Sequence, residues 1–160
     1  MTGLRYFTLT AVLLAAIAPA TRGADDDVAV VVNKTNAADD LTKAQLKKIL
    51  MGEQTSWPGG KKVVVVLRPP GQVDRGVVLR AICGMSEAEF NDHLMKANFS
   101  GDTGAAPKVA QSALAVRQLV MTTPGAVAFL RVSEVNDTVK QIKVDSVAAG
   151  APDYGIKPGK

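Results

Sequence analysis

LKKILMGEQTSWPGGKKVVVVLRPPG, residues 46–71, is the stretch that decides the fold of this chain. It opens with an apolar helical stripe that Gly52 can close, followed by a turn at Trp57-Pro58-Gly59-Gly60. Residues 63–67 form an unbroken apolar, β-branched run, which is typical of a strand buried on both faces. Arg68-Pro69-Pro70-Gly71 then breaks the chain, because proline cannot continue a helix or a central strand.

The alternation of strands and helices continues on both sides of this stretch. Thr42-x-x-Gln45 and Ser86-x-x-Glu89 have capping-box spacing and predict helices that begin there. Two further helices are expected over residues 74–83, ended by Gly84, and over 112–122. Strands are expected over residues 28–32, 62–67, 126–130 and 139–144. This order predicts an α/β fold in which helices flank a mostly parallel sheet.

The two ends of the chain differ from the middle. Residues 1–23 are typical of a signal peptide: Arg5 precedes a mostly apolar region of thirteen residues, 6–18, which is too short to span a membrane comfortably. Cleavage after Ala20 or Gly23 fits, with Gly23 favoured, and an uncleaved N-terminal anchor is the alternative. We therefore expect a periplasmic or secreted protein. A single lobe is expected over 24–147, and residues 148–160, rich in Ala, Gly and Pro, are expected to form a flexible tail.

Composition narrows the function classes. Apolar residues make up 47% of the chain and charged residues 21%, which is a globular composition. Beyond residue 23 there are seventeen basic and fifteen acidic side chains, a net charge of +2. No basic cluster is interleaved with aromatic residues, so nucleic-acid binding is not expected. Cys83, the one cysteine, lies on an apolar helical stretch and is expected to be a buried thiol.

Catalytic and metal-binding motifs are absent from the sequence. It contains no G-x-S-x-G, no Walker A loop and no H-E-x-x-H. His93 is the one histidine, with no second His or Cys at ligand spacing, so neither a metal site nor a cofactor is expected. Asp25-Asp26-Asp27 is expected to be a solvated, frayed segment. A binding or interaction protein is expected rather than an enzyme.

These landmarks, in this order, resemble the second lobe of the phosphate-binding proteins that serve ABC transporters, which have the type II periplasmic binding fold. In that family a helix leads to a Trp, a strand and an Arg-led glycine turn, and a P-G-A-I-G-Y segment follows. Pro124-Gly125-Ala126-Val127-Ala128-Phe129 is similar to that last segment. The resemblance covers about residues 28–145 and implies one lobe, entered near Val28 and left near Val144.

The resemblance also implies ligand-binding roles for Arg68, Gly71, Gln72 and Asp74. In phosphate binders of the family this turn looks like R-x-x-G-S-G-T, and Arg68 and Gly71 match it. Gln72, Val73 and Asp74 stand in place of the Ser, Gly and Thr. Val73 adds bulk where the backbone should approach the ligand, and Asp74 is expected to cap the next helix with a carboxylate at the anion position. Oxyanion binding is therefore expected to be weak or lost.

Other residues have structural interpretations. The resemblance implies that Trp57 packs its turn against the sheet, and Gly125 is likewise assigned a structural role. Arg68 has structural alternatives as well: it caps the end of its strand, or it forms a surface ion pair with Asp74 or Glu53. Arg75 and Arg80 are expected to lie on the polar face of their helix, with solvated side chains.

Two functions follow from this sequence. The first is a solute-binding protein that holds phosphate or another small oxyanion through Arg68 and the amides of residues 71–74. In this first function, the single lobe pairs with a second copy or with another protein to complete the cleft. The second function is that of a periplasmic adaptor, in which a degenerate lobe binds a partner protein. In either case, membrane contact is expected only through a transporter or the signal peptide.

Overall fold

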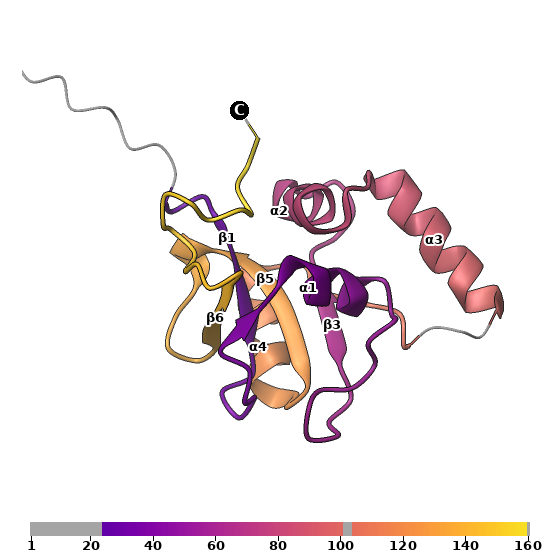
Figure 1. Ribbon diagram of the computed structural model, residues 1–160, viewed down its shortest axis with the longest axis horizontal. Coiled ribbons are helices and arrows are strands. Elements are labelled where there is room, and N and C mark those ends of the chain that lie inside the picture. The colour runs from indigo at the N-terminus through magenta and orange to yellow at the C-terminus, as the bar shows by residue number, and fades with distance from the viewer. Residues whose placement is uncertain (1–23, 101–103, 160) are drawn as a thin grey trace, which may run out of the picture.

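The computed structural model describes residues 24–100 and 104–159, so the expected signal peptide over 1–23 lies outside it. Figure 1 shows a twisted sheet flanked by helices, with strand order β2-β6-β1-β5-β3-β4. The strands are β1 (Val28–Val32), β2 (Asp40–Leu41), β3 (Val64–Leu67), β4 (Lys108–Val109), β5 (Ala126–Arg131) and β6 (Lys140–Val144). The helices are α1 (Lys43–Leu50), α2 (Val73–Val78), the π-helical turn η1 (Leu79–Cys83), α3 (Glu87–Ser100), α4 (Ala113–Thr122) and the 3₁₀ turn η2 (Val132–Glu134).

The predicted α/β class is confirmed, and the sheet is mixed. Among the described residues, β3 pairs in parallel with β4 and β5, and β2 pairs in parallel with β6. The central strand β1 runs antiparallel to both of its neighbours, β5 and β6. The first residue of β1 therefore lies at the same edge of the sheet as the last residues of β3, β5 and β6.

Two apolar clusters cover the two faces of the sheet. Val28, Val30 and Val32 of β1 face the larger cluster, which includes residues of α1, α2, η1 and α3. Val31 faces the smaller one, where α4 contributes Val116. All five residues of β1 are buried, which explains why the strand is apolar on both faces. No helix within residues 24–100 and 104–159 combines the length and apolarity needed to cross a bilayer.

The helix starts predicted from the two capping boxes are confirmed. The Thr42 hydroxyl accepts from the Gln45 N–H at 3.1 Å, and the Gln45 side chain accepts from the Thr42 N–H at 2.9 Å. Ser86 and Glu89 make the same reciprocal pair at the start of α3. Gly84 ends the helical run of α2 and η1 in the left-handed conformation, with φ +68°.

The C-terminal segment does not have the flexible course that its composition predicts for residues 148–160. The Tyr154 hydroxyl donates to the Val28 carbonyl at 2.8 Å, and the Val28 N–H donates to the Ile156 carbonyl at 3.0 Å. Both Tyr154 and Ile156 are buried. Two buried residues thus attach this segment to the first residue of β1, so it is part of the lobe.

Asp27, at the entrance to β1, is also not part of a frayed segment. Its side chain is buried, and burial raises the pKa of its carboxyl. Two groups of the C-terminal segment oppose that rise in pKa, the Lys157 ammonium and the Gly150 backbone N–H. The Asp27 carbonyl in addition accepts from the Val132 N–H at 2.9 Å.

Cys83 is buried, as the sequence predicts, and burial raises the pKa of its thiol to about 11. Because the thiolate is the reactive form, the native protein at pH 8 should react with a disulfide reagent at least ~100-fold more slowly than the urea-unfolded chain, whose thiol has a pKa of about 8.5. Stopped-flow labelling in the two states measures this ratio. Equal rates would contradict the buried position of Cys83.

Candidate functional site

The expected ligand turn lies at the edge of the sheet where β3 ends. Leu67 is the last residue of β3, and residues 68–71 lead directly into α2. The strand β5 runs parallel to β3, and β1 runs in the opposite direction to both. Arg131 at the end of β5 and Asp27 just before β1 therefore lie at this same edge. Figure 1 shows α2 and the C-terminus on one side of the sheet, near this edge.

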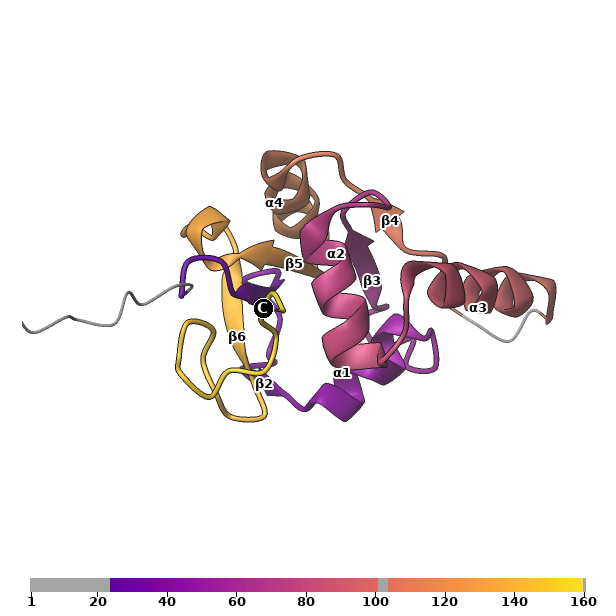
Figure 2. The same ribbon diagram turned by 90° about the horizontal axis from the view of Figure 1, so that it is seen from above.

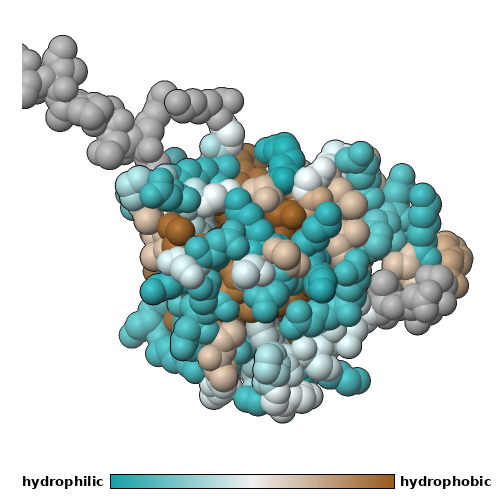
Figure 3. All heavy atoms as spheres, viewed as in Figure 1, coloured by the Kyte–Doolittle hydropathy of each residue, from teal (hydrophilic) through white to brown (hydrophobic). Residues whose placement is uncertain are grey.

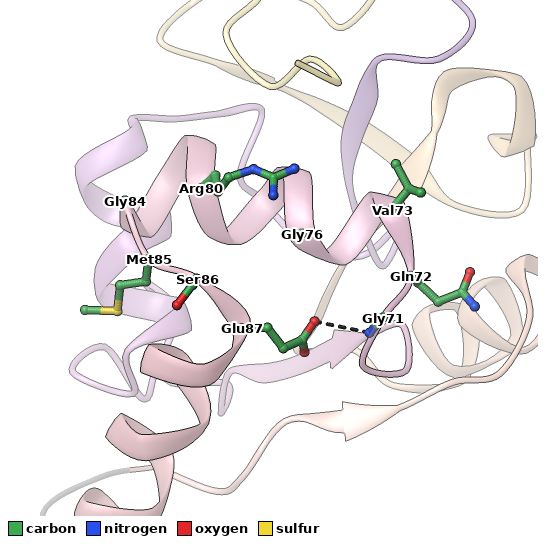
Figure 4. A pocket seen from close by; sticks show the side chains of 9 residues that line it. All are labelled: Gly71, Gln72, Val73, Gly76, Arg80, Gly84, Met85, Ser86 and Glu87. Carbon is green, nitrogen blue, oxygen red and sulfur yellow. Dashed lines mark hydrogen bonds between the residues drawn. The ribbon is translucent and has the colours of Figure 1, made fainter. Parts of the chain in front are cut away.

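The turn has the backbone geometry that its glycine allows. Gly71 has φ +84°, a conformation in which a residue with a Cβ is strained. The Gln72 N–H donates to the Pro69 carbonyl at 3.3 Å, and the Gly76 N–H donates to the Gln72 carbonyl at 3.1 Å. Gln72 is therefore the N-cap residue of α2, but its side chain makes no capping bond. Figure 4 shows this side chain extending away from Glu87 and Arg80.

Asp74 does not cap the helix, which corrects the prediction from sequence. It is the second residue of α2 and is buried, and its Oδ1 accepts from the Arg131 Nε at 2.8 Å. This bond and the charge of Asp74 hold the pKa of Arg131 above its usual value. Arg131 was not singled out in the sequence, because only the parallel pairing of β3 with β5 brings residues 57 positions apart together.

Arg75 is a second correction, because it is buried instead of solvated, with only 5% of its side chain exposed. Its Nη1 donates to the Arg68 carbonyl at 3.0 Å, and its Nη2 donates to the Asn91 side chain at 3.3 Å. Its Nε forms an ion pair with Glu87, and its guanidinium lies 5.9 Å from the ring centroid of Phe90. Arg75 thus joins the turn to α3. Arg80, in contrast, is exposed as predicted.

Glu87 accepts a hydrogen bond from the backbone of the turn. Its Oε2 accepts from the Gly71 N–H at 3.2 Å, and its Oε1 pairs with Arg75 (Figure 4). A pocket of about 580 Å³ lies beside this contact. It is lined by Gly71, Gln72, Val73, Gly76, Arg80, Gly84, Met85, Ser86 and Glu87.

Arg68 is the residue of the turn whose charge has no partner in the described part of the chain. Its Nε and Nη1 are buried and have no hydrogen-bond acceptor there. The alternative partner Asp74 is bonded to Arg131, and no ion pair of Arg68 with Glu53 is formed among the described residues. Buried donors without acceptors are costly, so a water molecule or an anion that accepts from them would stabilise the turn.

Trp57 and Gly125, the two residues assigned structural roles, contact each other. The Trp57 Nε1 donates to the Gly125 carbonyl at 2.9 Å, and the indole is 5% exposed. The Val64 N–H donates to the same carbonyl at 3.0 Å. One backbone carbonyl therefore connects the tryptophan turn, the start of β3 and the start of β5.

Residues 20–154 match the family described as the PBP superfamily domain. The chain belongs to this family. An ABC-type phosphate transport receptor from Vibrio cholerae is 24% identical, with a TM-score of 0.64 over 78% of this chain and 48% of that one. A putative phosphate ABC transporter substrate-binding protein with bound phosphate, from Clostridium perfringens, is 26% identical, with a TM-score of 0.63 over 78% and 47%. PstS from Borrelia burgdorferi is 16% identical, with a TM-score of 0.65 over 84% and 55%.

This PBP superfamily domain spans about half the length of these three solved proteins. Its sheet and flanking helices match a lobe-sized part of them, which confirms the predicted fold class. Within residues 24–100 and 104–159, no group of three or more His, Cys, Asp or Glu side chains is placed to hold a metal ion. The chemistry available at the turn is thus that of guanidinium groups, carboxylates and backbone amides.

Proposed function

We propose that this chain is a solute-binding-type protein that binds phosphate or a similar small oxyanion weakly at the turn formed by residues 68–74. One observation carries the proposal: the Nε and Nη1 of Arg68 are buried and lack an acceptor in the described part of the chain. Guanidinium groups prefer oxyanion acceptors, since charge-assisted hydrogen bonds are about twice as strong as neutral ones. The phosphate bound by the relative from Clostridium perfringens supports the same ligand class.

The charges around the turn support an anionic ligand. Two carboxylates contact the turn, but each is already paired with its own guanidinium, Asp74 with Arg131 and Glu87 with Arg75. The charge of Arg68 is therefore not balanced by either of these carboxylates. Gln72 is exposed and keeps a side-chain amide donor at the position where the resembling family has Ser.

The same contacts favour weak binding. The Gly71 N–H already donates to Glu87, so an oxyanion must compete for it. Val73 is 59% exposed and adds a branched side chain at the first position of α2.

The location and partners are part of the proposal. The apolar N-terminal segment supports secretion or export to the periplasm, where an ABC transporter is the partner of phosphate-binding proteins of this kind. Neither a metal ion nor an organic cofactor is required for oxyanion binding by Arg68 and backbone amides.

A thermal-shift titration of the purified chain with phosphate tests the proposal. Ligand that binds only the native state stabilises it by RT ln(1 + [L]/Kd), about 1.4 kcal/mol at ten times Kd, so the Tm should rise over millimolar phosphate. Arg68→Ala should abolish the rise, whereas Lys48→Ala, which removes an exposed positive charge from α1, should keep it. Chloride at equal ionic strength is the salt control. A Tm that is indifferent to phosphate, or equal shifts in both variants, would overturn the proposal.

A protein-interaction module is the second candidate, favoured by the outer end of α3. Met95 and Phe99 lie one helical turn apart there and are 60% and 88% exposed. Figures 1 and 2 show that α3 projects from the rest of the lobe, and Figure 3 shows paler brown residues near that end on an otherwise largely polar face. The phosphate titration separates the candidates, because an adaptor with a degenerate turn should not be stabilised by any oxyanion.

A further inference from the structure

Glu87 is placed as an anion would be placed at this turn. One carboxylate oxygen accepts from the Gly71 N–H at 3.2 Å, and the other pairs with the Nε of Arg75. Its side chain is 28% exposed and borders the pocket of about 580 Å³, so solvent and small ions can reach it (Figure 4). A backbone amide plus a guanidinium is the donor set that also suits an oxyanion.

We infer that Glu87 is an internal competitor that sets the oxyanion affinity of the turn: a small oxyanion binds by taking over the Gly71 N–H from the Glu87 carboxylate. This inference rests on the proposed function and adds its regulation. The ligand class is a tetrahedral oxyanion such as phosphate, because its several acceptor oxygens suit a site that offers more than one donor, the Gly71 N–H and the Arg68 guanidinium of the same turn.

Electrostatics gives the direction of the effect. Glu87 neutralises Arg75, which is 5% exposed, so the pair presents no net charge to an incoming anion. Replacing the carboxylate with the neutral amide of glutamine keeps the shape of the side chain and leaves Arg75 as a second positive charge beside Arg68. Removing one negative charge at a distance of a few ångströms is expected to tighten phosphate binding about tenfold.

The helix that carries Glu87 offers a matched control. Glu89 stands two residues further along α3 and binds Ser86 at 2.7 and 2.8 Å instead of contacting the turn. Those hydrogen bonds lower the pKa of the Glu89 carboxyl, so the group is ionised at neutral pH. Glu89→Gln therefore removes the same charge from the same helix end and keeps a side chain suited to the capping box.

The test is the phosphate affinity of the purified full chain, measured by isothermal titration for the unaltered protein, Glu87→Gln, Glu89→Gln and Glu87→Gln combined with Arg68→Ala. Thermal melts without phosphate establish that each variant is folded. We expect Glu87→Gln to bind about tenfold more tightly. Glu89→Gln should match the unaltered chain, and the double variant should lose the gain.

The outcomes separate the inference from the proposed function. If phosphate binds through Arg68 but Glu87→Gln leaves the affinity unchanged or weaker, the competitor role is overturned and the proposed function stands. If Glu87→Gln and Glu89→Gln tighten phosphate binding equally, the change in affinity comes from long-range charge alone. That result would also overturn the competitor role of Glu87. If none of the four proteins binds phosphate, both the inference and the proposed function are wrong.

Discussion

Replacing Gly125 with alanine is expected to lower the free energy of unfolding by more than about 3 kcal/mol, because a buried steric clash cannot relax without moving backbone. A Cβ at this position would lie 1.8 Å from the carbonyl oxygen of Lys62. The same glycine's carbonyl accepts from both Trp57 and Val64, so any shift also weakens two hydrogen bonds. A loss of this size is a large part of the 5–15 kcal/mol that stabilises a typical domain.

Urea denaturation measures the effect of Gly125→Ala, and Gly76→Ala is its matched control. At Gly76 in α2, a Cβ would meet only the flexible Arg80 guanidinium, 3.7 Å away. Alanine also has the higher helix propensity, so Gly76→Ala should be neutral or stabilise by up to about 1 kcal/mol. A Gly125→Ala variant within 1 kcal/mol of the unaltered chain would contradict the close approach of residues 62 and 125.

The second large effect is expected for Arg75→Met, which should cost about 3 kcal/mol of stability. Methionine fills similar space but leaves the Glu87 carboxylate without its cation and the Arg68 carbonyl without its donor. It also removes the bond to Asn91 and the contact with Phe90, which attach α3 to the turn. Each lost partner of a buried polar group adds its own desolvation cost.

Arg80→Met is the control for Arg75→Met, because Arg80 is exposed and lies five residues further along the same helical run. That variant should stay within about 0.5 kcal/mol of the unaltered chain. Adding Glu87→Gln to Arg75→Met should recover part of the loss, since the unpaired carboxylate is then gone. Equal denaturation midpoints for Arg75→Met and Arg80→Met would show that the buried ion pair is not formed.

Local features of this fold could be predicted from the sequence because neighbouring residues determine them. The capping boxes at Thr42 and Ser86 form hydrogen bonds with backbone groups within four residues. The apolar runs at 28–32 and 63–67 are typical of strands that are covered on both faces. The direction of each strand in the sheet could not be predicted from such local patterns. An apolar run has the same pattern whether its neighbours are parallel or antiparallel, so the reversed course of β1 was not predicted.

The sequence points to a turn as the candidate site, but it does not give the contacts of that turn. Arg68 and Gly71 were identified from the turn, whereas the partners that decide its charge come from distant segments, Arg131 from β5 and Glu87 from α3. The sequence predicts Asp74 as a cap because it stands at the start of a helical pattern. The helix begins at Val73 instead, and the Asp74 carboxylate accepts a hydrogen bond from Arg131. Tertiary pairing overrode a local preference at that position.

The C-terminal segment was misjudged for a different reason. Its Ala, Gly and Pro content is typical of a flexible tail, and composition averages hide single anchoring residues. Tyr154 and Ile156 are enough to attach it, because one supplies a buried hydroxyl donor and the other a carbonyl acceptor for the two backbone groups of Val28.

The central claim, that Arg68 holds an oxyanion at this turn, is tested most directly by equilibrium dialysis of the purified chain against radiolabelled phosphate. The account predicts saturable retention of phosphate that unlabelled phosphate displaces and chloride does not. Arg68→Ala should abolish this retention, and Lys48→Ala, which removes an exposed positive charge from α1, should leave it unchanged. Absence of retention at millimolar phosphate, or retention that survives Arg68→Ala, would contradict the account.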